Sequence, residues 1–200
     1  MAFPAEVYSA RLPDDTPLML RPPTYDELNA LMPTPGSVWE YVGDSDPAVF
    51  LREDTAGNLM DSLESPHLRS WGIEAYGRIV GVTGIIQWDV PYPGGFTFIM
   101  DPAVWQKGVG STARTIASKD VFDREEDCRA VGAYAHIQNR ASQRMLQGIG
   151  FQTLLRGREW DYFVLPRLDG TGPPGLPPDQ LEDGRRKFAA KIAASVIRRV

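Results

Sequence analysis

The amino-acid sequence predicts a mixed α/β or α+β domain. Along most of the chain, strand patterns alternate with helix patterns, and short runs of β-branched and aromatic residues end at glycine or proline. The 200 residues suffice for one domain with a buried core, and a composition of 42% hydrophobic and 24% charged residues is typical of globular proteins. We therefore expect a folded chain rather than general disorder.

Charge and composition narrow the classes of function. The formal net charge of −5 gives no overall attraction to nucleic acid or to an anionic membrane, and it mildly favours cationic partners such as amines. Because Cys128 is the only cysteine and His67 and His136 are the only histidines, we expect no intramolecular disulfide and no metal site. Residues 1–15 lack a secretory signal pattern, and no stretch is apolar enough to span a bilayer, so we expect a cytoplasmic protein.

The first third of the chain contains one clear strand and one clear helix start. Residues 18–21 are typical of a short strand, which a pair of prolines ends. Thr24 is a suitable N-cap for a helix that continues to about Leu31. Residues 33–66 show mixed patterns, with one helix expected at about 47–53.

From Trp71 to Pro166 the patterns are regular. Two alternating segments joined at Gly77 predict a β-hairpin, and a second hairpin is expected at the end of this region. In chain order we expect strands at 71–76, 78–88 and 96–100, a helix at 111–124, a strand at 130–136, a helix at 139–147, and strands at 151–155 and 160–165.

The composition changes after Pro166. We expect a main domain at 1–166, a Pro/Gly-rich linker at 167–178 and a basic amphipathic helix at 179–200. The apolar residues of this helix recur every four positions: Phe188, Ile192, Val196 and Val200. Three interpretations remain open for this stripe: it packs on its own domain or on a second copy in an oligomer, it binds another protein, or the basic face contacts nucleic acid or anionic lipid.

The loop from Trp105 to Gly110 carries the clearest chemical signal. It lies between a predicted strand and a predicted helix, and Gly108 and Gly110 allow close approach of the backbone to a ligand. The N–H groups that begin the following helix form an anion site suited to a pyrophosphate, with Lys107 adding charge at its edge. The alternative is an ordinary tight turn. The loop is neither a Walker A sequence nor the opening of a dinucleotide-binding βαβ unit.

Two segments in order give the chain a family resemblance. The strand before Asp101-Pro102, followed by the loop Trp105-Gln106-Lys107-Gly108-Val109-Gly110 and a helix, resembles motif A of the GNAT N-acetyltransferases. The later segment, which begins Asn139-Arg140-Ala141-Ser142 and ends Gly150-Phe151, is similar to the RimJ/RimL branch. The resemblance covers residues 17–166. It implies the GNAT acyl-CoA N-acyltransferase fold, a mixed, strongly twisted sheet with helices on both faces, here followed by the linker and the C-terminal helix.

The same resemblance implies how acetyl-CoA is bound. The pantetheine is expected to run beside the strand at 96–100, held by the backbone N–H groups near Ile99 and Met100, one of which also polarises the thioester carbonyl. Asn139 is expected to bond the pantetheine in addition to capping its helix. The pyrophosphate is expected on the backbone of the loop and helix start, at Gln106, Lys107, Gly108, Val109, Gly110 and Ser111.

The catalytic residues are less well defined, because two positions depart from the family pattern. Leu146 replaces a tyrosine that acts as general acid in many GNATs, which shifts the proton-donor role to Ser142; the alternative is a serine bonded back to its helix. Gly95 stands at about the place of a glutamate that commonly takes the proton of the amine. The candidates for this base are Glu74, His136 and Asp161. The alternative for His136 is a satisfied polar residue at a strand end, and for Glu74 and Asp161 it is a role in a salt bridge or at the surface.

The resemblance therefore predicts an N-acetyltransferase that moves the acetyl group of acetyl-CoA to a primary amine, such as a protein N-terminus or a small molecule, by direct attack. Transfer through Cys128 is not expected, because this residue follows the motif A helix. The alternative function is a catalytically weak GNAT-fold binding or structural protein that acts through its C-terminal arm in an oligomer or assembly.

Overall fold

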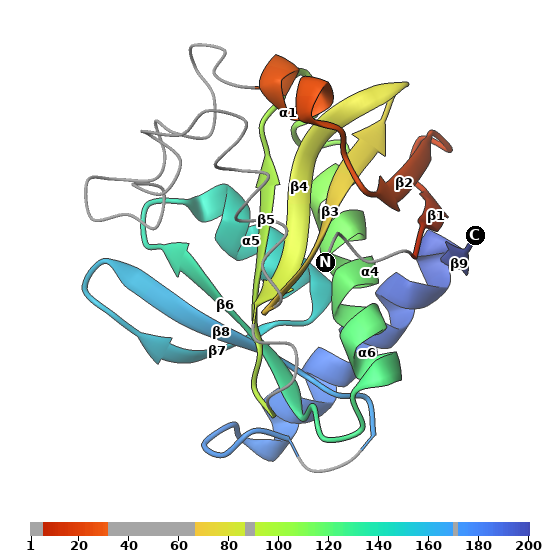
Figure 1. Cartoon of the computed structure of the whole chain (residues 1–200). Coiled ribbons are helices and arrows are strands. Elements are labelled where there is room, and N and C mark those ends of the chain that lie inside the picture. Colours follow the sequence, from red (N-terminus) through yellow and green to blue (C-terminus); the bar gives the residue numbers. More distant parts are fainter. Residues whose placement is uncertain (1–5, 32–66, 87–90, 170–171) are drawn as a thin grey trace.

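The computed structural model describes residues 6–31, 67–86, 91–169 and 172–200 (Figure 1). Within these residues one mixed sheet has the strand order β7-β8-β6-β5-β4-β3-β2-β1-β9. The strands are β1 (Tyr8–Arg11), β2 (Pro17–Arg21), β3 (Leu68–Ala75), β4 (Arg78–Ile86), β5 (Gly94–Ile99), β6 (Ala130–His136), β7 (Gln152–Arg156), β8 (Trp160–Pro166) and β9 (Arg198–Arg199). The helices are α1 (Tyr25–Leu31), the 3₁₀ turn Pro102–Val104, α4 (Val109–Arg124), α5 (Arg140–Ile149) and α6 (Pro178–Ser195). The helix expected at 47–53 lies outside the described residues.

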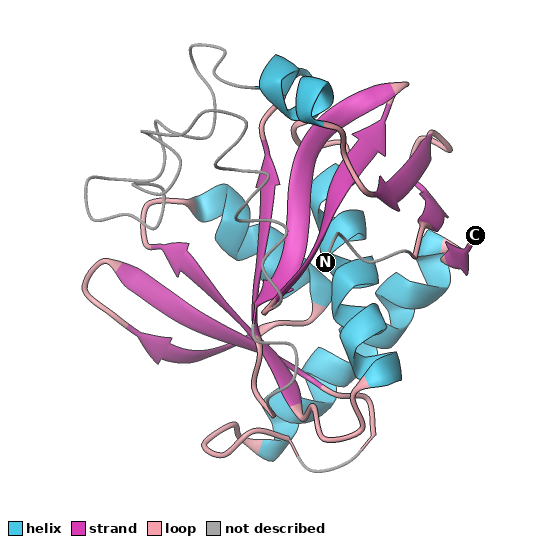
Figure 2. Cartoon of the chain, in the orientation of Figure 1, coloured by secondary structure: helices cyan, strands magenta, loops and turns pink. Residues whose placement is uncertain are grey.

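Helices pack against this sheet to form the core (Figure 2). Helix α4 contacts β4, β5, α5 and α6, while α1 contacts β4. The apolar residues of α4, among them Ala113, Ile116 and Val121, are buried against alternate residues of the strands such as Val80 and Val131. The expectation of a mixed sheet with helices around it is confirmed.

The first elements form where local signals are strong. In α1 the Thr24 hydroxyl accepts from the Glu27 N–H (3.3 Å) and the Glu27 carboxylate accepts from the Thr24 N–H (2.8 Å), which is a capping box. The β3–β4 hairpin turns through Tyr76 (φ 54°) and Gly77 (φ 76°), and both residues have the positive φ of a type I′ turn.

The centre of the sheet separates into two halves between β5 and β6. Strand β5 pairs antiparallel with β4 from Gly94 to Ile99, whereas its parallel pairing with β6 is limited to Gly94 and Gly132. Figure 2 shows the two strands diverging beyond this point. The facing edges of β5 and β6 therefore do not satisfy each other's backbone groups.

The C-terminal segment differs from the prediction. The helix ends at Ser195 rather than Val200, because Val196 adopts a left-handed conformation (φ 45°) and the chain then forms β9. Strand β9 pairs antiparallel with β1, a strand that the sequence did not reveal, and the Val200 N–H donates to Val7 O (2.9 Å). The packing is within the same chain: Phe188 is buried against Phe122, with ring centroids 5.8 Å apart.

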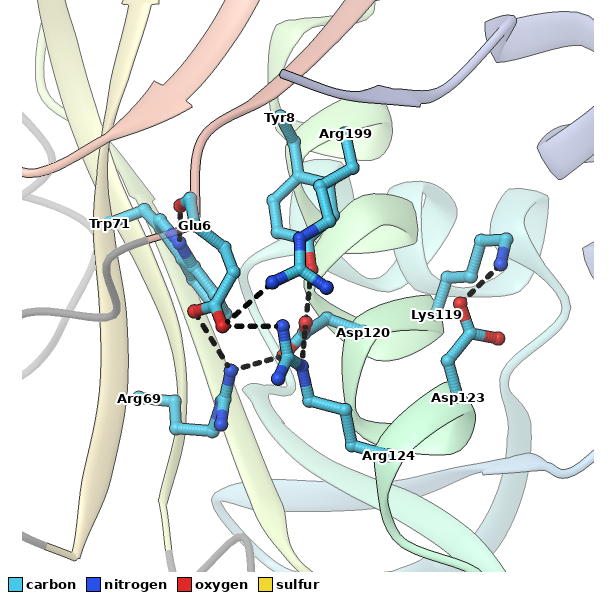
Figure 3. Close-up of polar contacts among 9 residues, drawn as sticks. All are labelled: Glu6, Tyr8, Arg69, Trp71, Lys119, Asp120, Asp123, Arg124 and Arg199. Carbon is cyan, nitrogen blue, oxygen red and sulfur yellow. Dashed lines mark hydrogen bonds and ion pairs between the residues drawn. The ribbon is translucent and has the colours of Figure 1, made fainter.

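An ionic network joins the N-terminal segment to α4, β3 and β9 (Figure 3). The Glu6 carboxylate lies 2.7 Å from Arg124, 3.1 Å from Arg199 and 3.5 Å from Arg69. Asp120, which is buried, pairs with Arg124 and Arg69 and accepts from the Tyr8 hydroxyl. These contacts hold both ends of the described chain against α4. No helix in the described ranges is long and apolar enough to cross a membrane.

Candidate functional site

The loop before α4 has the geometry expected of an anion site. Gln106 (φ 63°) and Gly108 (φ 84°) both adopt left-handed conformations, and Gly108 is the N-cap of α4 without a side-chain hydrogen bond. A β-carbon on Gly108 would also lie 2.8 Å from Pro13 Cδ, so glycine is required for two reasons. The Thr112 N–H donates to Gly108 O (2.9 Å), which begins the helical ladder. The N–H groups of the preceding helical residues thus have no acceptor within the helix.

The side chains around this loop supply little of the anion site, so the backbone N–H groups are its main donors. Lys107 is exposed, and its Nζ lies 4.9 Å from the ring centroid of Tyr76. The Ser111 hydroxyl donates to Gly108 O (2.9 Å) and so helps to hold the loop. Val109 is buried in the core. The residues predicted at 106–111 are therefore together at the start of α4, where the helix dipole favours an anion.

Gly110 marks the place where β5, α4 and α5 meet. A β-carbon on Gly110 would lie 3.0 Å from Met145 Sδ and 3.3 Å from Ile99 Cγ1. Met145 is one turn after Ser142 on α5, so both residues share a helix face. The structure thus brings the loop, Ile99 and the face of α5 that carries Ser142 close to one another.

The two residues predicted on β5 differ in their backbone directions. The Met100 N–H donates to Val80 O (2.9 Å) and is therefore paired with β4, while its contact with the pantetheine stays a prediction. Successive residues of a strand direct their backbone groups to opposite sides, so the backbone groups of Ile99 point to the side on which β6 diverges from β5. Its carbonyl accepts from Trp105 Nε1 at 3.0 Å. The tryptophan at the head of the loop thus fixes the loop to the end of β5.

Asn139 caps α5, as predicted. Its Oδ1 accepts from the Ser142 N–H (2.9 Å). The Ser142 side chain is half-buried, and its hydroxyl has no hydrogen bond to any described residue. The alternative of a serine bonded back to its helix is therefore not observed. Leu146 is buried in the core and supplies no acid group.

The three candidate bases lie in different surroundings. Glu74 on β3 is ion-paired with Arg21, with 2.5 Å between Oε2 and Nε, which is the salt-bridge alternative. His136 ends β6, next to the start of α5; its Nδ1 accepts from the Gln138 N–H (3.2 Å), and its ring meets Trp160 edge to face. Asp161 pairs in register with Ala135, so it points to the sheet face opposite to His136. The structure does not bring the three together.

A buried arginine that the sequence patterns do not reveal lies at the junction of β4, β5 and β6. Arg114 of α4 is 1% exposed, and its guanidinium donates from Nη2 to Gly132 O at 3.0 Å. Burial lowers the pKa of Arg114 to about 9. Arginine normally occurs at the exposed positions of a helix, and α4 has no distinct polar face that would have located this one.

Two further groups bear on the chemistry. Burial raises the pKa of the Cys128 thiol to about 12, so at neutral pH it is a protonated core residue rather than a nucleophile. Among the described residues, no group of three or more histidine, cysteine or acidic side chains is arranged to hold a metal ion.

Comparisons with known proteins agree with this architecture. Residues 17–152 match the family model described as "Acetyltransferase (GNAT) domain". A search of curated proteins finds no match to the sequence. Among solved structures, RimJ from Mycobacterium smegmatis in complex with CoA-disulfide is 14% identical in sequence and has a TM-score of 0.62. The match covers 98% of this chain and 99% of the RimJ chain. The spermidine/spermine N-acetyltransferase SpeG from Vibrio cholerae has 13% identity and a TM-score of 0.53, covering 75% and 94%. The aminoglycoside acetyltransferase AAC(6')-Ib in complex with coenzyme A has 12% identity and a TM-score of 0.56, covering 80% and 95%.

Proposed function

The chain belongs to the family of GNAT acetyltransferases, and on this basis we propose that it binds acetyl-CoA and transfers the acetyl group to a primary amine by direct attack. The observation that carries the proposal is the loop at Gly108, whose left-handed backbone and unpaired helix N–H groups suit a pyrophosphate. The separation of β5 from β6 supports a place for the pantetheine beside it.

The cofactor contacts follow from the backbone directions. The pyrophosphate is held by N–H groups between Gln106 and Ser111, with the Lys107 side chain at the edge; the Lys107 N–H itself donates to Val104 O (3.4 Å). The Ile99 backbone, which faces the gap beside β5, bonds the pantetheine or the thioester carbonyl. The amide of Asn139 adds a further hydrogen bond while its Oδ1 caps α5.

Transfer is proposed to take place in one displacement. The amine nitrogen attacks the thioester carbonyl carbon, the C–S bond breaks, and the nitrogen loses one proton while the CoA sulfur gains one. Ser142 donates that proton to sulfur, because its hydroxyl has no described partner and shares a helix face with Met145 beside Gly110. His136 and Asp161 remain the candidates for the base. The products are an N-acetyl amide and free CoA.

The acceptor is proposed to be a protein N-terminus or a small-molecule amine in the cytoplasm. The names of the structural neighbours, which include spermidine/spermine and aminoglycoside acetyltransferases, support amines as a class. The second candidate is a GNAT-fold protein that binds CoA but turns it over slowly, alone or in an oligomer. Gly95, Leu146 and the ion-paired Glu74 favour it, because each removes a residue that would act as acid or base.

Thermal unfolding with and without acetyl-CoA tests the binding step. At 100 times the dissociation constant, the ligand should stabilise the protein by about 2.7 kcal/mol, which raises Tm by several degrees. Lys107→Glu reverses an exposed charge at the loop and should reduce the shift without unfolding the protein, and Gly108→Asp should abolish it. Folded protein that shows no shift would contradict the proposal.

Turnover is then measured as release of the CoA thiol over a panel of a polyamine, an aminoglycoside and a peptide with a free N-terminus. Release with any of them establishes transfer. Binding of acetyl-CoA without release would favour the second candidate.

A further inference from the structure

Arg114 lies where β5 and β6 separate, and it contacts three strands at once. Its Nη2 donates to Gly132 O on β6 (3.0 Å), and its Nη1 lies 3.4 Å from Gly84 O on β4 and 3.5 Å from Phe96 O on β5. The single pair between β5 and β6 involves the same Gly132. One guanidinium therefore bridges the sheet at the point beyond which the two strands diverge.

Gly95 makes room for this side chain. A β-carbon built on Gly95 would overlap the Nη1 atom of Arg114, and the carbon and second nitrogen of the guanidinium would also be too close. The face of the guanidinium lies over the ring of Phe151, 5.1 Å from its centroid. Arg114 and Gly95 thus act as one unit: any larger residue at 95 displaces the guanidinium.

The charge of Arg114 has no acidic neighbour on the elements that surround it. Strands β4, β5 and β6 and helix α5 contain no aspartate or glutamate, and the described part of the chain gives Arg114 no ion pair. Its Nε has no hydrogen-bond partner among the residues that the structure describes. The titratable and charged residues on those four elements and on β8 are Arg78, Tyr134, His136, Arg140, Arg144, Asp161 and Tyr162. Burial of a cation without a carboxylate partner lowers the stability of the fold, which indicates that Arg114 has a role other than stabilisation.

We propose that Arg114, with Gly95, is a positioning residue for acyl transfer, which links β5 and β6 at the point where they separate and places a positive charge beside the proposed site of the thioester. This inference rests on the proposed function. During transfer the N–C bond forms and the C–S bond breaks, so negative charge develops first on the carbonyl oxygen and then on the CoA sulfur before sulfur takes up its proton. A cation already held in a water-poor site stabilises both anions without reorganisation.

The thiol pKa of bound CoA depends on this charge, and it can be measured without an acceptor amine. Below about pH 9 Arg114 carries its charge, which favours the thiolate. The thiol pKa of CoA in the complex, determined from the thiolate fraction in this range, should therefore be lower than in an Arg114→Met variant by about one unit. The thiolate is followed by its ultraviolet absorbance during a pH titration. Cys128 does not interfere, because burial raises its pKa to about 12. Arg114→Lys retains the charge and should restore most of the shift.

Two further variants separate the charge from general damage to the fold. Lys119→Met removes another cation of α4, one paired with Asp123 at the surface, and should leave the thiol titration unchanged. Gly95→Ala displaces the guanidinium by overlap and should raise the thiol pKa as Arg114→Met does. The double variant Gly95→Ala with Arg114→Met should be more stable than the sum of the single effects predicts, because the overlap is gone.

The outcomes distinguish this inference from the proposed function. If the parent protein does not bind CoA, the proposed function fails and the inference with it. If CoA binds and its thiol titrates identically in the parent and in Arg114→Met, the inference is overturned while the proposed function stands. Should Arg114→Met not fold, the comparison of the parent with Gly95→Ala and Arg114→Lys decides in the same way.

Discussion

The N–H of Ser142 donates to Oδ1 of Asn139 at 2.9 Å, so the two polar residues assigned to the start of α5 form one helix cap. Because this bond uses the backbone of Ser142 and the carbonyl oxygen of the Asn139 side chain, it leaves the serine hydroxyl and the asparagine amide for other partners. A cap and a ligand contact are therefore compatible in the same pair of residues. The two roles can be separated by substitution.

Ser142→Ala should lower kcat and leave stability almost unchanged. The backbone N–H that Asn139 accepts is retained, whereas the proposed proton donor is lost, and proton donors of this kind contribute about 100-fold or more to the rate. Steady-state kinetics with the acceptor that shows turnover measures kcat, and calorimetry measures the affinity for acetyl-CoA, which should not change. An unchanged kcat would remove Ser142 from the mechanism.

Asn139→Asp should separate capping from cofactor binding. Aspartate also accepts the Ser142 N–H, so the free energy of unfolding should stay close to that of the parent, whereas Asn139→Ala should lower it by about 1 kcal/mol. Both variants lose the amide donor and should bind acetyl-CoA more weakly. If Asn139→Asp binds acetyl-CoA as tightly as the parent, then Asn139 serves the helix alone.

Local patterns predicted the parts of the fold that depend on nearby residues. The strand at 130–136 has the bounds that its alternation suggests, and Thr24 and Asn139 cap helices where the chain changes direction. Strand β9 was missed because it is only two residues long and pairs with β1 across the whole length of the chain. Strand β1 also pairs locally with β2, but its four residues are too few for a clear alternating pattern. The end of α6 was missed for a similar reason, since no glycine or proline marks the left-handed turn at Val196.

In the candidate site too, features that depend on nearby residues could be predicted, whereas those that depend on distant residues could not. The loop at Gly108 was recognisable because its glycines and the following helix lie within a few residues. The direction of the Met100 N–H depends on pairing with β4, and the position of Arg114 depends on space that Gly95 leaves in another element. Neither relationship follows a periodic pattern in the sequence that could have predicted it. The salt bridge of Glu74 with Arg21 was likewise visible only once β2 and β3 were paired.

Glu74→Gln should have little effect on turnover. The carboxylate is held by Arg21, and loss of a true general base would lower kcat about 100-fold or more. We expect a kcat close to that of the parent and a loss of about 1 kcal/mol or less in the free energy of unfolding, because the pair is partly exposed. A large fall in kcat with unchanged acetyl-CoA affinity would return Glu74 to the catalytic candidates.

Glu27 should make stability depend on acid pH. The hydrogen bonds from Arg21 lower the pKa of Glu27 from 4.5 to about 2 although burial opposes the shift. A depressed folded pKa means that the carboxylate stabilises the native state above pH 4.5 and that this contribution disappears as the pH falls from 4.5 towards 2. Because the side chain is 32% exposed, we expect about 1 kcal/mol in all.

Denaturant unfolding of the parent and of Glu27→Gln across this pH range measures the contribution. The difference in unfolding free energy should be largest near neutral pH and should shrink in acid. Asp26→Asn on the same helix is the matched control, since among the described residues Asp26 has no ion pair. A difference that stays constant from neutral pH to acid would show that the Arg21 pair does not control this titration.

Phe188→Ala tests whether α6 belongs to the cooperative unit of the main domain or is an appendage, as the predicted boundary at 166/167 would allow. Phe188 is 1% exposed and packs on Phe122, so its truncation should cost about 3–5 kcal/mol and lower Tm markedly. Val200→Ala, at a side chain that is 77% exposed, should change stability by less than about 0.5 kcal/mol. Calorimetric scans of both variants give the comparison. A single unfolding transition that moves with Phe188→Ala but not with Val200→Ala would show that the tail and the domain unfold together, whereas an unmoved main transition would make α6 an independent segment.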